Sequence, residues 1–235
     1  IRSREKGEIY FPKLMEIKMK EFWKKIAFRY TKFGAPRYEY NLEPAQLAEI
    51  VLSLNLRCEH TGDINIFEIG VARGMTTRFI AEHLNTSGYE VNFFCLDTFS
   101  SFTENDKEYE IKNRGKLKHD LIGFAYNDFS VWKNNFKKYS FVKPLKCDAG
   151  DFDFSKIEGG VDFIFLDVDL YQPTIKVLRN CKSYLNDGAI ILVDDVRDNN
   201  RWDGSYEAFF DFVKEEKLDY EIIGNKCGKI VWKTD

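Results

Sequence analysis

The chain has 235 residues, enough for one domain with appendages and a full hydrophobic core. Hydrophobic residues make up 44% of it and charged residues 31%, which is ordinary for a soluble globular protein. The net charge of −3 argues against a nucleic-acid partner, whose binding surface would make the domain strongly basic, and the longest uncharged apolar run, residues 189–193, is far too short to cross a membrane.

The cysteines and residues 1–11 indicate in which cellular compartment the protein is expected. Five cysteines are widely spaced, odd in number, and form no Cys-x-x-Cys pair. Cys95 and Cys147 lie in apolar runs, where a buried reduced thiol is the usual interpretation. The three histidines are scattered, so no zinc site is predicted. Residues 1–11 alternate charged and apolar side chains without the apolar core of a signal peptide. We therefore expect a cytoplasmic protein with no membrane segment.

Helical patterns open the chain. Residues 13–33 carry apolar side chains at helical spacing with lysines between them, which predicts an amphipathic helix with a solvated basic face. A second helix is expected over residues 43–56, and Pro44 suits its first turn. We expect residues 1–60 to form an N-terminal helical extension and residues 61–235 to form the main domain.

From residue 64 onward, short apolar segments alternate with helical ones. The apolar segments are continuous runs, as expected for a parallel sheet that is covered on both faces. They comprise residues 64–69, 91–96, 141–145, 161–166 and 189–193. Helical patterns lie between them, at residues 75–85, 128–138 and 173–185. This alternation predicts βαβ crossovers and a doubly wound α/β sheet.

The last part of the chain has a different pattern. A helix near residues 204–217 is followed by two short β runs, residues 220–223 and 230–232, around an Asn/Gly-containing connection that predicts a hairpin. An antiparallel hairpin closing a mostly parallel sheet of seven strands is typical of the Rossmann-like class I methyltransferase fold. Residues 100–127, rich in charge and aromatic groups without a clear period, are expected to be an insertion on the substrate side of the sheet.

A glycine turn follows the first predicted strand and opens a helix. Gly70 and Gly74 let the backbone pass close to a ligand without a Cβ in the way, and the helix start with Thr76 supplies free N–H groups. Only two glycines are present, and Glu68 stands two residues before the first. An acidic residue there suits a cationic amino-acid ligand better than a pyrophosphate. A tight βα turn without any ligand is the alternative.

Acidic residues also end the next two strands. Asp97 follows the second strand, where a carboxylate accepts hydrogen bonds from both ribose hydroxyls of an adenosine. Asp148 follows the third strand and is a candidate acceptor for an adenine amino group. A solvated strand-end carboxylate is the alternative for Asp97, and a loop cap is the alternative for Asp148.

Carboxylates are densest after the fourth and fifth strands. Asp167 and Asp169 follow one of them, and Asp194 and Asp195 follow the other. Adjacent parallel strands bring their carboxyl ends together, so these groups are expected to converge in one crevice. Like charges this close raise one another's pKa, and a divalent cation such as Mg²⁺ or Ca²⁺ relieves the repulsion. Carboxylates satisfied by helix N-termini and backbone are the alternative.

Four segments together resemble one family of enzymes. The sequence contains EIGVARG from residue 68, LDTFSSF from 96, DVDLYQPT from 167 and VDD from 193. This combination resembles the macrocin O-methyltransferase (TylF/MycF-like) family, which methylates sugar hydroxyls of natural products with S-adenosylmethionine (SAM). The resemblance covers roughly residues 64–215.

The resemblance implies roles for particular residues. It implies SAM contacts from Glu68, Gly70 and Asp97. It implies that Asp167, Asp194 and Asp195 hold Mg²⁺, with Asp167 also the candidate base. It further implies a small-molecule acceptor that contains a sugar, and a homo-oligomer with the N-terminal helix as its arm.

Other interpretations of the site remain open at this stage. A metal-dependent catechol-type O-methyltransferase uses the same arrangement of carboxylates at strand ends, and a SAM-binding protein without catalysis would use the same glycine turn. The acceptor pocket is expected to draw on aromatic residues, although aromatics in such numbers are more often core. The candidates are Phe99, Phe102, Tyr109, Phe124, Tyr126 and Trp202.

Overall fold

The computed structural model describes residues 11–34, 38, 40–60, 64–198 and 201–234. The chain divides into two compact units, residues 1–39 and residues 40–235. The first unit contains helix α1 (Phe11–Tyr30) and a short 3₁₀ turn, so the helix predicted over residues 13–33 is present. Large apolar side chains are exposed along it, among them Phe22 and Trp23. Among the described residues, no helix is long and apolar enough to cross a membrane.

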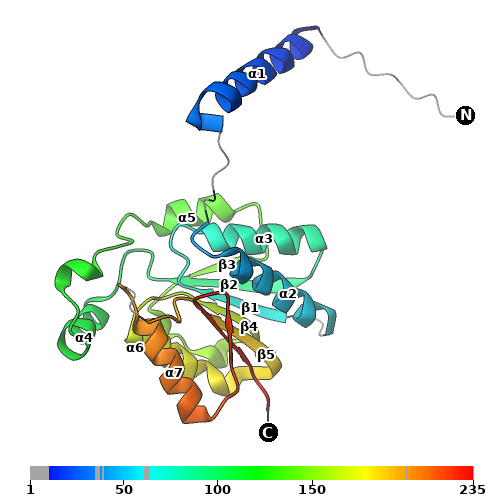
Figure 1. The fold of residues 1–235 in the computed structure, drawn as a ribbon. Coiled ribbons are helices and arrows are strands. Elements are labelled where there is room, and N and C mark those ends of the chain that lie inside the picture. Colours follow the sequence, from blue (N-terminus) through cyan, green and yellow to red (C-terminus); the bar gives the residue numbers. More distant parts are fainter. Residues whose placement is uncertain (1–10, 35–37, 39, 61–63, 199–200, 235) are drawn as a thin grey trace, which may run out of the picture. The chain divides into compact units, whose positions relative to one another are not determined.

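The second unit is built on one seven-stranded sheet (Figure 1), with strand order β3-β2-β1-β4-β5-β7-β6. The first five strands run parallel, and β7 pairs antiparallel with both β5 and β6. This confirms the predicted fold class, including the C-terminal hairpin. The strands are β1 (Ile64–Ile69), β2 (Val91–Asp97), β3 (Val142–Lys146), β4 (Val161–Leu166), β5 (Leu185–Val193), β6 (Glu221–Ile223) and β7 (Cys227–Val231).

Helices cover both faces of the sheet, as the continuous apolar strands require. They are α2 (Pro44–His60), α3 (Met75–Ser87), α4 (Glu104–Arg114), α5 (Phe129–Phe136), α6 (Tyr171–Cys181) and α7 (Gly204–Glu216). Helix α2 belongs to the same compact unit as the sheet, whereas the sequence placed a domain boundary after residue 60. Its buried residues Ile50 and Leu54 pack into the core that also holds strand residues.

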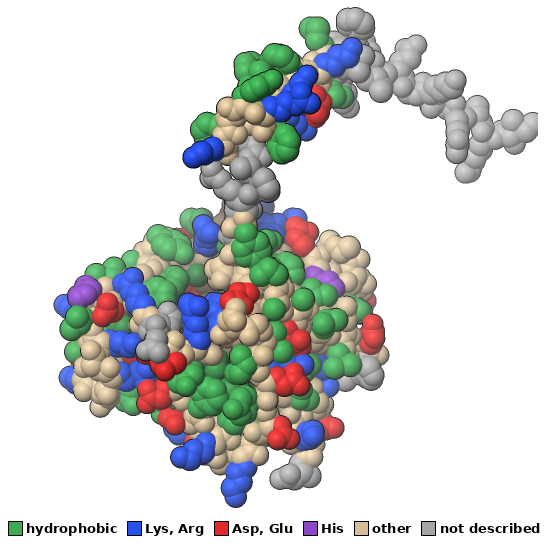
Figure 2. Space-filling view, viewed as in Figure 1, with side chains coloured by type: hydrophobic (Ala, Val, Ile, Leu, Met, Phe, Trp, Pro, Cys, Tyr) green, Lys and Arg blue, Asp and Glu red, His purple; other side chains and the backbone are tan. Residues whose placement is uncertain are grey.

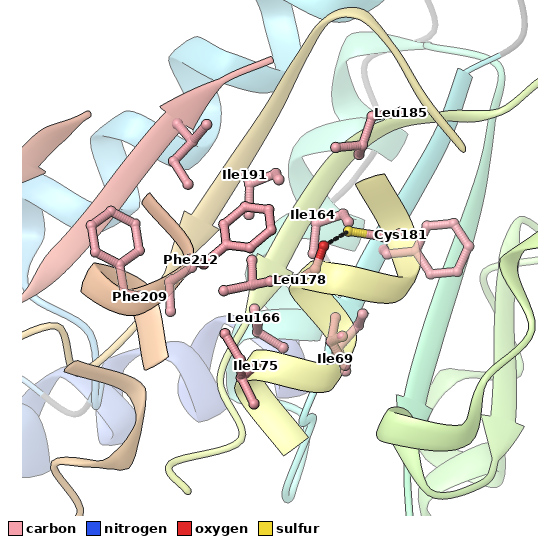
Figure 3. Close-up of a cluster of buried hydrophobic side chains, with 14 of the residues drawn as sticks. Ile69, Ile164, Leu166, Ile175, Leu178, Cys181, Leu185, Ile191, Phe209 and Phe212 are labelled. Atoms are coloured by element: carbon pink, nitrogen blue, oxygen red, sulfur yellow. Dashed lines mark hydrogen bonds between the residues drawn. The ribbon is translucent and has the colours of Figure 1, made fainter. Parts of the chain in front are cut away.

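Alternate residues of each strand face two separate cores. In β1, Phe67 and Ile69 face the α6–α7 side, whereas Ile64 and Ile66 face the side of α2, α3 and α5. Figure 3 shows how side chains of α6 and α7 meet those of β1, β4 and β5 in the first of these cores. Full burial of each such aliphatic or aromatic side chain contributes about 1.5–3 kcal/mol, so the two layers hold the strand ends in register.

The predicted insertion, residues 100–127, contains helix α4, which the sequence analysis did not predict. Only two of its eleven residues, Tyr109 and Ile111, are apolar, so it has no hydrophobic stripe. Instead it is fixed by buried polar contacts. The carboxylate of Glu110 accepts from Arg114 Nε at 2.9 Å and from the backbone amide of Tyr171 at 2.8 Å, at the start of α6.

Arg114 extends this polar contact to a third helix. Its guanidinium also donates to Asp203 Oδ1 at 2.7 Å and contacts Glu207 at the start of α7, while Lys116 pairs with the same oxygen of Asp203 at 2.7 Å. The insertion is therefore tied to the starts of both α6 and α7.

Candidate functional site

A cavity of about 450 Å³ opens at the carboxyl ends of the central strands. The sheet ladder explains its position. The amides of Gly70, Asp167 and Asp194 each donate to a carbonyl near the end of the neighbouring strand, at 2.8 to 2.9 Å, so the residues that follow β1, β4 and β5 are aligned. The strand order reverses between β1 and β4, which is where open α/β sheets bind ligands.

The glycine turn after β1 forms one wall of the cavity. Gly70 and Gly74 have φ angles of 86° and 87°, a region that favours glycine. A Cβ on Gly70 would collide with the carbonyl oxygen of Asp167, and one on Gly74 would lie 2.6 Å from the ring of Phe136. Both glycines are thus required by packing within the protein. Gly70 lines the cavity, and Gly74 is not among its lining residues.

Asp97, at the end of β2, holds the glycine turn in place. Its carboxylate accepts from the amides of Val71 and Ala72 at 2.9 and 3.1 Å, and from the amide of Phe99 at 2.6 Å. Asp97 also lines the cavity. Because an ionised carboxylate accepts about four hydrogen bonds, these three contacts leave capacity for a ligand hydroxyl.

Both carboxylate oxygens of Glu68 are fully buried and lack a hydrogen-bond partner among the described residues. Its side chain is 1% exposed and yet lines the cavity. Burial raises the pKa of Glu68 to about 8, and the negative charge of Asp97 adds to this. Thr77, close by in α3, lowers the pKa in part without completing a hydrogen bond of ordinary geometry. A buried carboxylate without a partner, facing a cavity, suits a cationic ligand.

Two further predicted residues also line the cavity. Thr76 is buried in the first turn of α3. Asp148 caps the short 3₁₀ turn η3 (Ala149–Asp151) by accepting from the amide of Gly150 at 3.0 Å, which is the loop-capping role weighed in the sequence analysis. Asp148 also lines the cavity, where it is placed to contact a ligand in addition to capping the turn.

Four carboxylates converge beside the glycine turn, from Asp167, Asp169, Asp194 and Asp195, and all four line the cavity. Burial raises the pKa of Asp167 well above its ordinary value, and the charges of Asp194 and Asp169 raise it further. Burial and the charge of Asp195 do the same for the pKa of Asp169. Within the described chain, no hydrogen bond engages the Asp167 carboxylate. It is thus available to a ligand.

Lys226, in the turn between β6 and β7, is a site residue that the sequence analysis did not predict. Its Nζ donates to Asp194 Oδ2 at 2.9 Å and to Asp195 Oδ1 at 3.0 Å. Burial alone would lower the pKa of Lys226, but the two carboxylates outweigh burial and raise it. The other oxygen of Asp194 accepts from Gln46 Nε2 of α2 and from the amide of Asp195, both at 2.7 Å.

These contacts bear on the divalent cation that the sequence predicted at Asp167, Asp194 and Asp195. Both oxygens of Asp194 already accept hydrogen bonds, and one oxygen of Asp195 accepts from Lys226. No group of three or more acidic, histidine or cysteine side chains in the described residues is arranged to hold a metal ion. A divalent cation at this position would have to compete with Lys226 and Gln46 for the oxygens of Asp194 and Asp195.

Aromatic side chains form the outer part of the cavity. Four of the six predicted candidates line it, namely Phe102, Phe124, Tyr126 and Trp202. The other two pack elsewhere. Phe99 is buried against Phe129 and Trp132, and Tyr109 stacks on Tyr171 with ring centroids 5.5 Å apart.

Trp202 is held in a fixed orientation. Its indole N–H donates to the carbonyl of Asp120 at 2.8 Å, and its ring lies 5.8 Å from that of Phe102 and 5.6 Å from that of Phe124. Together the three rings, Phe102, Phe124 and Trp202, form an aromatic wall on the side of the cavity that residues 100–127 cover.

The sheet order, the terminal hairpin and an acidic pocket beside a strand–glycine turn–helix unit define a class I SAM-dependent methyltransferase. Residues 67–196 match the model of a family described as a methyltransferase domain, a match that spans more than half of the chain. The chain belongs to this family.

Solved structures agree on the fold. The calicheamicin methyltransferase CalS11 is 14% identical, with all of both chains covered and a TM-score of 0.61. The O-methyltransferase NovP is also 14% identical, with 90% of this chain and 88% of that chain covered and a TM-score of 0.64. The apo structure of CalS11, described as a TDP-rhamnose 3'-O-methyltransferase, is 16% identical, with coverage of 100% and 97% and a TM-score of 0.57. No curated protein matches the chain.

Proposed function

We propose that this protein transfers the methyl group of SAM to a hydroxyl of a sugar-containing small molecule. The observation that carries the proposal is the Asp167 carboxylate, which faces the cavity without a hydrogen-bond partner and has a raised pKa. Two structural neighbours support O-methylation, since NovP is described as an O-methyltransferase and CalS11 as a TDP-rhamnose 3'-O-methyltransferase. The DVDLYQPT segment supports membership of the macrocin O-methyltransferase family.

The glycine-turn side of the cavity is the proposed SAM site. Glu68 accepts from the cationic amino group of the SAM methionine moiety, which supplies the partner that the buried carboxylate lacks. Gly70 and Thr76 border that end, and Asp97 accepts from the ribose hydroxyls. Asp148 lies on the wall proposed for the adenine. When bound, SAM supplies an electrophilic methyl group on a positively charged sulfur.

Asp167 is the proposed general base. A carboxylate whose pKa is raised is a stronger base than an ordinary aspartate, so it takes a hydroxyl proton more readily. The Asp167 carboxylate would accept the hydroxyl proton as the acceptor oxygen takes the methyl group, whose bond to the SAM sulfur breaks to leave S-adenosylhomocysteine. Holding the acceptor hydroxyl in line with the methyl group contributes up to ~7–11 kcal/mol through orientation alone.

The aromatic wall is the proposed acceptor site. Phe102, Phe124 and Trp202 line the cavity with their rings in mutual contact, and the apolar face of a sugar ring or an aromatic aglycone packs against them. The indole hydrogen bond to Asp120 keeps the Trp202 ring in one orientation, which limits the ordering that binding requires. Two of the three ligands predicted for Mg²⁺, Asp194 and Asp195, accept hydrogen bonds from Lys226, and Asp194 also accepts from Gln46, so the proposed mechanism has no step that depends on Mg²⁺.

Calorimetric titration with S-adenosylhomocysteine (SAH), followed by methyl-transfer assays, tests the proposal. We expect micromolar SAH binding in the wild type and in Glu158→Gln, an exposed control, and binding weakened at least tenfold in Glu68→Gln. Turnover of nucleotide-linked sugars but not of catechols is expected. Catechol turnover alone would select the catechol-type enzyme, SAH binding without any turnover would favour a non-catalytic binder, and no SAH binding would refute the proposal.

A further inference from the structure

The ammonium group of Lys226 lies between the two carboxylates that end β5. Its Nζ is 2.9 Å from Asp194 Oδ2 and 3.0 Å from Asp195 Oδ1, and the side chain is only 11% exposed. A surface lysine that happens to reach a carboxylate is normally well exposed and contributes little. Lys226 instead forms part of the cavity wall.

The backbone of Lys226 is fixed to the end of β5. Its carbonyl accepts from the amide of Val196 at 2.7 Å, just past the two aspartates. The preceding residue, Asn225, donates its backbone amide to Glu43 Oε2 at 3.1 Å. These contacts hold the hairpin tip against β5 on one side and against the start of α2 on the other.

Helix α2 holds the carboxylate of Asp194 through a separate contact. Gln46 donates to Asp194 Oδ1, while its own Oε1 accepts from the amide of Glu43 at 2.9 Å. Asp194 is therefore held by a cation on one oxygen and by two neutral donors on the other. A divalent cation would have to displace a buried charge-assisted hydrogen bond in order to coordinate this carboxylate.

We infer that Lys226 takes the place of a divalent cation, so that a covalently attached ammonium supplies the positive charge of the site and methyl transfer proceeds without metal. The catalytic part of this inference rests on the proposed function, whereas the part that concerns metal binding does not. An ammonium has three N–H donors, and within the described chain two of them are engaged by Asp194 and Asp195. The third donates to an acceptor oxygen next to Asp167 and positions the hydroxyl to be methylated.

Lys226→Met tests this role, with Lys229→Met as the matched control. Lys229 lies three residues further along the same hairpin and pairs with Glu49 at 2.9 Å, and it does not line the cavity. Mn²⁺ binding is measured by electron paramagnetic resonance on SAH-loaded and SAH-free protein, and turnover is measured with and without EDTA.

We expect no Mn²⁺ binding below millimolar concentration in the wild type and in Lys229→Met, and turnover that EDTA leaves unchanged. In Lys226→Met we expect the freed carboxylates to gain Mn²⁺ binding at least tenfold stronger than in the wild type. We also expect kcat to fall about 100-fold, the usual loss when one charge-stabilising donor is removed, with the SAH Kd changed less than threefold.

Stoichiometric micromolar Mn²⁺ binding by the wild type that is lost in Asp194→Asn would overturn the inference, as would turnover that EDTA abolishes and Mg²⁺ restores. The Mn²⁺ titration and the EDTA assay on the wild type show whether the site uses a metal even if Lys226→Met does not fold. If no acceptor is turned over but SAH binds, the metal titration still tests Lys226, so its failure and the failure of the proposed function are distinguishable.

Discussion

Replacing Glu68 by Gln makes the pH dependence of stability a direct test of the buried, unpartnered carboxylate. Glutamine has nearly the same shape and carries no charge at any pH. In the ligand-free wild type, burial raises the pKa of Glu68 from its ordinary 4.5 to about 8. A group whose pKa is raised by folding contributes stability that is fully present below the unfolded-state value and is lost as pH rises through the folded-state value.

The size of the effect follows from the two pKa values. With 4.5 in the unfolded chain and about 8 in the folded one, keeping this carboxyl buried costs about 2 kcal/mol at pH 6 and about 4 kcal/mol at pH 8. Glu68→Gln removes this cost. The cost of burying the amide itself does not depend on pH, so it shifts both measurements equally.

Urea unfolding of ligand-free protein at pH 6, 7 and 8 measures the difference. The free energy of unfolding of the wild type should fall, relative to Glu68→Gln, by about 2 kcal/mol between pH 6 and pH 8. Glu158→Gln, which removes one exposed carboxylate, is the control and should track the wild type. A difference between wild type and Glu68→Gln that is the same at pH 6 and pH 8 would show that Glu68 does not carry a raised pKa.

Four further predictions concern catalysis and packing. Asp167→Asn should abolish turnover while changing the SAH Kd less than threefold; full activity of this variant would remove Asp167 from the mechanism. Because a base acts in its ionised form and the pKa of Asp167 is raised, the acid limb of the kcat profile should lie well above the range of an ordinary aspartate, and an acid limb near pH 4 would contradict the assignment. Trp202→Ala should raise the acceptor KM about fivefold and leave SAH binding unchanged, as measured by initial rates and calorimetry, from a stacking contribution of about 1 kcal/mol. Phe212→Ala, deep in the α6–α7 core, should lower the free energy of unfolding by about 3–5 kcal/mol in the same urea experiment, and a loss below about 1 kcal/mol would mean that this core collapses around the vacancy.

The sequence predicted best what depends on local pattern. Strands β1 and β4 begin and end at the predicted residues, because each is a mostly apolar run bounded by polar or glycine residues. The convergence of Asp167 and Asp194 followed from parallel pairing of adjacent strands, and the β4–β5 register confirms that pairing.

What the sequence did not predict depends on long-range contacts. Helix α4 lacks an apolar stripe because it is anchored by Glu110 and Arg114, and polar pairs of this kind have no periodic signature. The β6–β7 turn was recognised as a turn, but a turn pattern does not say where its tip packs. Lys226 reaches Asp194 across 32 positions of the chain, and Gln46 reaches it across 148. No local rule links such residues.

The predicted absence of a nucleic-acid partner stays a prediction. In Figure 2, acidic and basic side chains of the unit formed by residues 40–235 are interspersed over the face in view, whereas a nucleic-acid groove gathers basic ones. The predicted homo-oligomer stays a prediction, with the exposed apolar side chains of α1 as the surface to examine in a hydrodynamic measurement.

The polar contact that joins α4 to α6 and α7 limits how this enzyme can be re-engineered or diversify. The segment that covers the acceptor side carries Glu110 and Arg114, whose partners Tyr171 and Asp203 lie on the scaffold. A loop transplanted from another methyltransferase would leave a helix start uncapped and an acidic side chain without its guanidinium, at a cost of several kcal/mol. New acceptor specificity is therefore reached more readily by exchanging single residues of the aromatic wall than by recombining whole loops.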